Sequence, residues 1–174
     1  KFINKTGEYV LDRALLETMK SAGCCEIQIG IESGNDRVLR YINKDITLDM
    51  IRKCIHTIRN SGISWRVFVI VGFPTETKDE IRDTLNLVSE IRPTYLDLSI
   101  FSPYPGTEFF SQLKEKNLLG SNFAKSDMWY PYNNYTGTMS DEEFKGIGLE
   151  ALHFADRYNK RSKTDSYLSK IFRN

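Results

Sequence analysis

The sequence lacks the features that mark disulfide scaffolds, membrane proteins and nucleic-acid-binding proteins. Its 174 residues include only 3 cysteines, an odd number without disulfide-framework or zinc-site spacing. No apolar run approaches the roughly 20 residues that span a bilayer, and the first residues lack a signal-peptide layout. The net charge of +1 points to neither a nucleic acid nor an anionic membrane. These absences favour a cytoplasmic protein with no membrane span and no nucleic-acid partner.

The composition suits one globular domain of ordinary size. Hydrophobic residues make up 40% of the chain, which is enough to build a sizeable core. The chain begins at Lys1 rather than at a methionine, and its opening residues resemble the middle of a domain. We therefore expect a segment of a longer protein.

The cysteines and histidines predict no metal site. Cys24 and Cys25 are neighbours, so in a strand they would point to opposite faces and could not easily coordinate one metal ion together. Small buried hydrophobes are the favoured interpretation of these two and of Cys54. His56 and His153 lie within helical patterns and have no companion ligands at metal spacing.

Helix-like and strand-like segments alternate along most of the chain. Runs rich in β-branched and aromatic residues predict strands at 25–31, 65–73 and 95–101, the second of them buried on both faces. Apolar stripes at helical spacing predict helices within 11–22, 47–58, 77–91, 108–116 and 140–158. This alternation indicates parallel strands joined by crossover helices.

Polar and turn-forming residues follow each predicted strand. The first strand ends in GIESG (30–34), the second in VGFPTE (71–76) and the third in FSPYPGT (101–107). Because the carboxyl ends of parallel strands meet at one edge of a sheet, these segments are expected to line one pocket.

The stretch 119–138 has no clear period and is predicted to be a long ordered loop. Its Trp129, Tyr130 and Tyr132 would pack against the barrel or cover a flat substrate such as a tetrapyrrole, and packing is favoured.

The three strand-end motifs, with their order and spacing, resemble the fourth to sixth strand-helix units of radical S-adenosylmethionine (radical SAM) enzymes. The residues of these motifs are most similar to those of the branch with a cobalamin-binding domain. This branch includes the anaerobic magnesium-protoporphyrin monomethyl ester cyclases. The resemblance covers residues 1–118 and implies an α/β fold, a partial (half) TIM-like βα barrel with parallel strands. Residues 119–174 are then a loop and a C-terminal helical extension.

The resemblance also implies cofactors for a longer parent protein. That parent would bind S-adenosylmethionine (SAM) and a 4Fe-4S cluster, and cobalamin stays open as a third cofactor. The cluster motif of the family, Cys-x3-Cys-x2-Cys, occurs nowhere in this chain, nor does the glycine-rich segment that meets the SAM amino group. We therefore expect this chain alone to bind no cofactor, to supply no catalytic residue and to be inactive.

Three charged or polar residues are candidates for the methionine and ribose parts of SAM. Glu32 can accept hydrogen bonds from ribose hydroxyls or the ammonium, and Ser33 can donate to a carboxylate. Alternatively, Glu32 caps a helix or pairs with a cation, and Ser33 only makes a turn. Arg66 interrupts an apolar strand and would meet the SAM carboxylate, or form an ion pair with Glu26 or Asp97.

The remaining candidates concern adenine. In the family pattern Ile70 packs on the ring, although plain core packing is the favoured interpretation, and Gly72 gives close backbone approach. Phe101 and Ser102 would read the adenine edge with backbone N–H and C=O groups, or they simply end a strand.

The predicted function is a fragment of a radical SAM enzyme that supplies part of the SAM and substrate wall. A parent of this kind cleaves SAM reductively to start radical chemistry, with cyclisation or methylation of a tetrapyrrole-like substrate as examples. The alternatives are a non-catalytic half-barrel binding module and another βα-barrel enzyme such as an aldolase. The expected partners are the missing N-terminal half of the barrel and a small-molecule substrate. An exposed sheet edge also invites homodimerisation.

Overall fold

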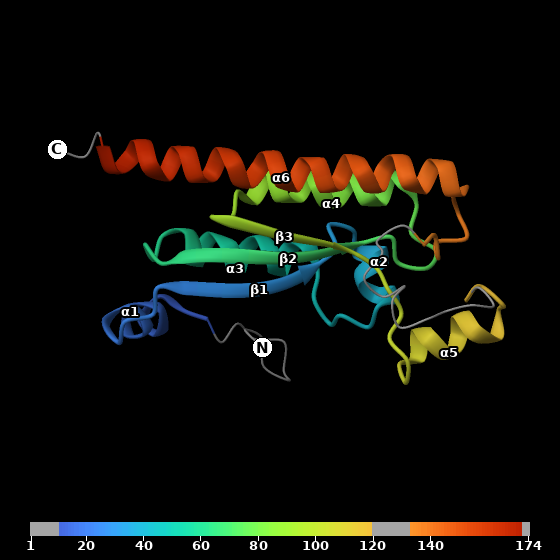
Figure 1. Cartoon of the computed structure of the whole chain (residues 1–174). Coiled ribbons are helices and arrows are strands. Elements are labelled where there is room, and N and C mark those ends of the chain that lie inside the picture. Colours follow the sequence, from blue (N-terminus) through green and yellow to red (C-terminus); the bar gives the residue numbers. More distant parts are fainter. Residues whose placement is uncertain (1–10, 120–132, 172–174) are drawn as a thin grey trace.

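The computed structural model describes residues 11–119 and 133–171 of the chain, with side chains described up to residue 161. Strands and helices alternate through most of this part (Figure 1). The elements are α1 (Arg13–Ser21), β1 (Glu26–Glu32), α2 (Asp36–Tyr41), α3 (Leu48–Arg59), β2 (Ser64–Val71), α4 (Lys78–Ile91), β3 (Tyr95–Ile100), α5 (Glu108–Glu115) and α6 (Asp141–Ile171).

The three strands form one parallel sheet in the order β1-β2-β3. Val67 at the centre of β2 lies between Ile29 of β1 and Leu96 of β3. Parallel neighbours need crossover connections, and here the α2–α3 segment and α4 supply them. The predicted α/β class with parallel strands is confirmed.

Local capping explains where the helices begin. The Thr77 hydroxyl accepts from the N–H of Glu80, while the Glu80 carboxylate accepts from the N–H of Thr77. This reciprocal capping box confirms the sequence prediction for α4. Ser140 and Glu143 make the same exchange of hydrogen bonds at the start of α6.

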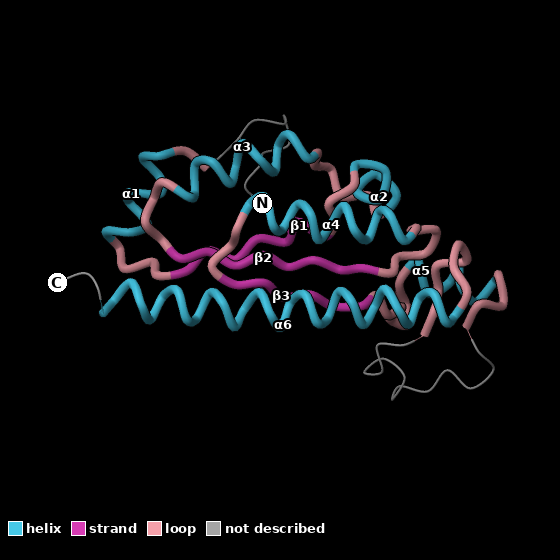
Figure 2. Tube along the Cα trace, turned by 90° about the horizontal axis from the view of Figure 1, so that it is seen from above, coloured by secondary structure: helices cyan, strands magenta, loops and turns pink. Residues whose placement is uncertain are grey.

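Side chains on the two faces of the sheet differ in burial. Alternate residues such as Ile29 and Val67 point to the face that α3 and α4 cover (Figure 2), where they join the main core. The other face, here called the open face, carries the residues between them: Glu26, Gln28, Ser64, Arg66, Phe68, Ile70, Tyr95, Asp97 and Ser99. The prediction that the second strand is buried on both faces is wrong, because Phe68 on the open face is 36% exposed. No described helix covers this face.

The long α6 runs alongside β3 in both views (Figures 1 and 2). Its Phe144, Ile147 and Ala151 are buried in a second core cluster with residues of β2 and α4. Further along, the Asn159 amide donates to the carbonyl of Leu96 at 2.9 Å and accepts from the Leu96 N–H at 3.0 Å. A side chain therefore takes the place of a neighbouring strand at this position of the β3 edge.

The 31-residue α6 is long, but neither it nor any other helix in residues 11–119 and 133–171 is apolar enough to cross a membrane. The helix shares its core with the sheet rather than standing apart from it. A boundary near residue 118 between barrel and extension stays a prediction.

Candidate functional site

Glu32 and Lys44 meet at the carboxyl end of β1. The Lys44 Nζ donates to Glu32 Oε1 at 2.8 Å, and both side chains are partly exposed. Glu32 has a positive φ of 62°, and its carboxylate lies beside Gly30, two residues earlier on the strand. A Cβ on Gly30 would lie 2.5 Å from Glu32 Oε1 and 3.4 Å from Lys44 Nζ, so glycine makes room for the pair. The cation-pairing alternative for Glu32 is what the structure shows, and its partner Lys44 was not among the SAM-site residues expected from the sequence.

Ser33 is fully buried and its hydroxyl is engaged locally. Its oxygen accepts from the N–H of Asn35 at 3.2 Å and lies 3.4 Å from the Thr84 hydroxyl on α4. Next to it, the N–H of Gly34 donates to the same hydroxyl at 2.8 Å. The turn therefore packs against α4, and these contacts match the turn-forming alternative for Ser33.

Arg66 lies in the amino-terminal half of β2, away from the strand ends that carry the other candidates. Its guanidinium bonds to Asp97 on β3 at 2.8 Å and lies 3.3 Å from a carboxylate oxygen of Glu26 on β1. The ring of Tyr95 lies beneath it, with 4.3 Å between the guanidinium carbon and the ring centroid. The bond to Asp97 is the main cause that raises the pKa of Arg66. The structure thus places Arg66 in the ion-pair alternative.

Ile70 and Gly72 lie near the carboxyl end of β2. Ile70 is half-buried and packs against an apolar cluster, as the core-packing alternative expects. Gly72 has a φ of 85°, and a Cβ there would lie 2.7 Å from the ring of Phe144 on α6. Glycine is therefore required at position 72 because the Phe144 ring of α6 lies close to the backbone there.

Phe101 and Ser102 follow β3. The N–H of Phe101 donates to the carbonyl of Val71 at 2.8 Å, so sheet pairing occupies the donor that was expected to read adenine. The Phe101 ring contacts Phe73 at 5.2 Å and Tyr135 at 6.2 Å between centroids. The hydroxyl of Ser102 is buried and bonds to no described group. The carbonyls of both residues and the N–H of Ser102 stay in the prediction.

Glu76 is a second residue that sequence reasoning did not single out. Its side chain is fully buried, and its Oε2 accepts from the N–H groups of Gly72 at 2.5 Å and Phe73 at 3.0 Å. The other oxygen, Oε1, bonds to no described group. Burial raises the pKa of this carboxyl to about 7, although the two N–H donors act in the opposite direction. The VGFPTE segment thus folds around its own glutamate.

The titration of Glu76 predicts a pH-dependent stability. Between pH 4.5 and about 7 the folded chain holds a proton on Glu76 that the unfolded chain has lost, so the free energy of unfolding falls as pH rises. Across that window the expected loss is about 3 kcal/mol. Glu76→Gln should flatten this slope, as measured by urea denaturation between pH 5 and 8. Equal slopes in both proteins would contradict the prediction.

The Arg37–Glu80 pair acts outside this pH window. It lowers the pKa of Glu80 to about 2, so its contribution to the free energy of unfolding is lost only as pH falls from 4.5 through 2.

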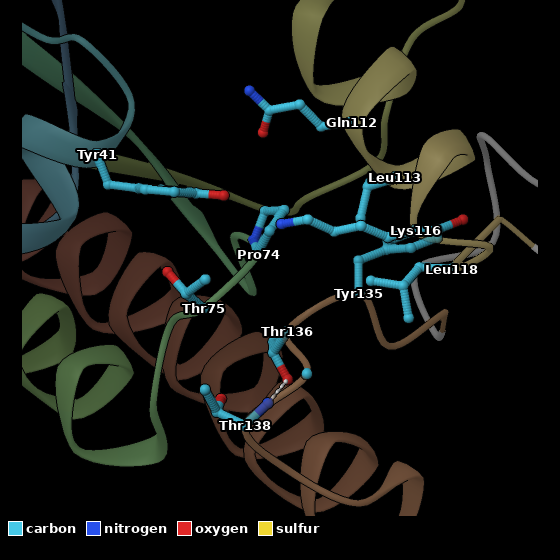
Figure 3. A pocket seen from close by; sticks show the side chains of 11 residues that line it. Tyr41, Pro74, Thr75, Gln112, Leu113, Lys116, Leu118, Tyr135, Thr136 and Thr138 are labelled. Carbon is cyan, nitrogen blue, oxygen red and sulfur yellow. Dashed lines mark hydrogen bonds between the residues drawn. The ribbon is translucent and has the colours of Figure 1, made fainter.

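A pocket of about 190 Å³ opens beside the carboxyl end of the sheet (Figure 3). Pro74 and Thr75 bring the loop after β2 to it, and Tyr41 comes from the end of α2. The remaining lining residues come from α5 and the segments that follow it: Gln112, Leu113, Lys116, Leu118, Tyr135, Thr136, Gly137 and Thr138. Of the three strand-end motifs, only the second contributes to this pocket.

The described residues do not fit an iron-sulfur cluster. Cys54 is buried, and burial raises the pKa of its thiol to about 11. Cys24 is half-buried and Cys25 is exposed. No group of three or more cysteine, histidine, aspartate or glutamate side chains gathers as a metal site within the part of the chain that the structure describes. Trp129, Tyr130 and Tyr132 lie outside the described residues.

Comparisons with known proteins agree with the fold and show which family the chain resembles. The coproporphyrinogen III oxidase HemN from Escherichia coli, a radical SAM enzyme, superposes with a TM-score of 0.60 at 21% identity, covering 85% of this chain and 30% of that one. The chain therefore has the architecture of part of a βα barrel. Residues 4–88 match the model of the radical SAM superfamily. This segment is similar to members of that superfamily.

Curated relatives are considerably longer than this chain. An uncharacterized methyltransferase from Pyrococcus horikoshii is 33% identical over 103 residues, which are 59% of this chain and 22% of that protein. The anaerobic magnesium-protoporphyrin IX monomethyl ester cyclase of Rubrivivax gelatinosus is 25% identical over 105 residues, 60% of this chain and 19% of that protein. The chain thus spans about a fifth of the length of these relatives. The resemblance to the radical SAM superfamily is confirmed.

Proposed function

We propose that this chain forms part of the SAM and substrate wall of a radical SAM enzyme. The observation that carries the proposal is the Glu32–Lys44 pair at the carboxyl end of β1. The methionine part of SAM bears one ammonium and one carboxylate, and a carboxylate next to an ammonium complements both. Neither side chain is fully buried, so each remains accessible to a ligand.

Other residues of the same end complete the proposed SAM wall. Ile70, with its half-buried side chain on the open face, offers an apolar surface for adenine. The Ser102 hydroxyl, buried without a described partner, has hydrogen-bonding capacity left for a polar edge. Because Arg66 is bound to Asp97 and Glu26, we assign it to the stability of the sheet and leave it out of this wall.

The bound cofactors would supply reductive cleavage of SAM and a 5′-deoxyadenosyl radical. No step is assigned to the cluster in this chain, which has no Cys-x3-Cys-x2-Cys motif. The part assigned to this chain is to orient SAM and to shape the substrate space at the strand ends. Cobalamin stays a proposal that rests on the family branch. By itself the chain is proposed to be inactive.

Two other functions remain as alternatives. An aldolase needs a nucleophilic amine at the strand ends, and Lys44 is the lysine that reaches them. Its Nζ donates to Glu32 Oε1 at 2.8 Å, so this carboxylate already occupies the amine that a carbonyl substrate would need. A half barrel that only binds a partner agrees with the absent cluster motif, and the experiment below separates it from the enzyme.

The proposed partners follow from the edges of the sheet. Asn159 covers the β3 edge at Leu96, whereas no described strand pairs with the outer side of β1. We therefore propose that the missing N-terminal half of the barrel, or a second copy of the chain, adds at β1. A small-molecule substrate and a cytoplasmic location remain part of the proposal, and a nucleic-acid partner does not.

The test uses the longer protein that carries this chain, reconstituted anaerobically with iron and sulfide. We expect a 4Fe-4S absorption spectrum and cleavage of SAM to 5′-deoxyadenosine. Glu32→Gln should weaken SAM binding roughly tenfold, because one charge-assisted hydrogen bond is lost. Equilibrium binding of radiolabelled SAM measures the effect.

Glu26→Gln is the matched control for Glu32→Gln. It makes the same change on the same strand about 20 Å away, at the amino end. SAM affinity should stay unchanged in this variant. If the longer protein takes up no cluster, the enzyme proposal fails and the binding module remains. If a cluster forms but both variants bind SAM equally well, the assignment of Glu32 fails.

A further inference from the structure

We propose that the pocket between the loop after β2, α5 and residues 135–138 binds the carboxylate of an organic anion with an apolar body. The pocket has one cationic side chain, that of Lys116, and no acidic one among its 11 lining residues. In Figure 3 the Lys116 amine reaches across the pocket toward Pro74, and the Tyr41 hydroxyl points into the same space. This inference rests on the proposed function, in which the same end of the sheet faces the substrate.

Lys116 is available for a ligand in the described part of the chain. The ion pairs found there join other lysines, such as Lys44, Lys53 and Lys160, to carboxylates, but none includes Lys116. An ammonium that faces a pocket without a counter-charge favours an anion there. Lys116 therefore sets the charge of the ligand.

The rest of the lining sets its shape and polarity. Pro74, Leu113, Leu118 and Tyr135 give the pocket an apolar surface, and Leu118 is 43% exposed. Hydrogen-bonding groups complete the lining: the hydroxyls of Tyr41, Thr75, Thr136 and Thr138 and the amide of Gln112. This mixture suits a carboxylate carried on an apolar arm.

The size and charge of the pocket favour a carboxylate over a phosphate. Its volume of about 190 Å³ holds one arm of a substrate rather than a whole drug-sized molecule. A single ammonium balances one carboxylate, whereas a phosphate dianion generally needs a second cation or several backbone N–H groups. Arg37 is the nearest candidate for a second cation, since it donates to Thr75, but Glu80 already binds its guanidinium through both carboxylate oxygens.

The pocket is held in shape by bonds that do not involve Lys116. The N–H of Thr75 donates to the Thr136 carbonyl at 2.7 Å, and the Thr138 hydroxyl donates to the Glu76 carbonyl. These bonds tie residues 136–138 to the loop after β2. A change at Lys116 should therefore alter the charge of the pocket and leave its walls in place.

The experiment titrates the full chain with benzoate and follows the backbone amides of Leu113, Thr136 and Thr138 by ¹H–¹⁵N NMR. We expect benzoate to shift these amides and Lys116→Gln to weaken its binding roughly tenfold. Lys114→Gln, the same change at a lysine of α5 that does not line the pocket, should bind benzoate like the parent chain. Benzamide, a neutral molecule of the same shape, should bind much more weakly.

Three results would overturn the proposal. Benzamide binding as tightly as benzoate would show that the charge plays no part. Equal losses in Lys116→Gln and Lys114→Gln would show a diffuse surface attraction, and inorganic phosphate binding more tightly than benzoate would show a different anion class. The titration needs neither SAM nor a cluster, so its failure would leave the proposed SAM wall untouched, and loss of that wall would not alter benzoate binding.

Discussion

Gly34→Ala is expected to lower the free energy of unfolding by about 3 kcal/mol. A Cβ at this position would lie 2.5 Å from the Cα of Thr84 and 2.6 Å from the carbonyl oxygen of Asp83. Both atoms belong to the backbone of α4, which cannot move aside as a flexible side chain would. Urea denaturation at pH 7 measures the loss.

The control for Gly34→Ala is Gly146→Ala on α6. Nothing lies within 4 Å of the added Cβ there, so the change should stabilise the chain by about 0.5–1 kcal/mol through helix propensity. A loss of stability in Gly34→Ala together with a gain in Gly146→Ala would show that Gly34 allows the turn after β1 to pack on α4. A loss below about 1 kcal/mol in Gly34→Ala would mean that α4 moves away easily, and the packing argument would fail.

Glu76→Ala is expected to cost about 3 kcal/mol of stability at pH 6. The change leaves the buried N–H groups of Gly72 and Phe73 without their acceptor, and each unsatisfied donor is costly. It also removes a carboxyl that is costly to bury when charged, so the loss should be smaller at pH 8 than at pH 6. Thermal and urea denaturation at both pH values measure the effect.

Glu115→Ala serves as the control for Glu76→Ala. Glu115 is exposed at the end of α5, where the same truncation should change stability by less than about 0.5 kcal/mol. If Glu76→Ala were equally mild, water or a neighbouring donor would have replaced the carboxylate. The loop after β2 would then hold its shape without Glu76.

Elements whose signals are local could be predicted from the sequence. The strand 64–71 has β-branched or aromatic residues in most positions, and Thr77 lies three residues before Glu80, so both elements depend on neighbours in the chain. The parallel topology followed from the alternation of strands and helices. The position of Glu32 followed as well, because a parallel sheet collects its strand ends at one edge.

The long-range contacts of the site could not be predicted in the same way. Lys44 lies beyond a helix in the sequence, yet its side chain reaches back to Glu32. Glu76 is buried because its own loop folds around it and Thr138, 62 residues further on, bonds to its backbone. Arg66 had two plausible roles until β1 and β3 brought Glu26 and Asp97 to either side of it.

The sequence by itself determined the α/β class, the order of the elements and the resemblance to the radical SAM superfamily, since periodicity, caps and ordered motifs depend on neighbouring residues. Only the tertiary structure decided the burial of Glu76, the partners of Arg66 and the reasons for Gly34 and Gly72. Those depend on which backbone or ring lies against each residue, such as α4 against Gly34 and Phe144 against Gly72. The contacts of the two glycines with Thr84 and Phe144 join positions 50 and 72 residues apart in the chain, a separation at which no local pattern specifies the neighbour.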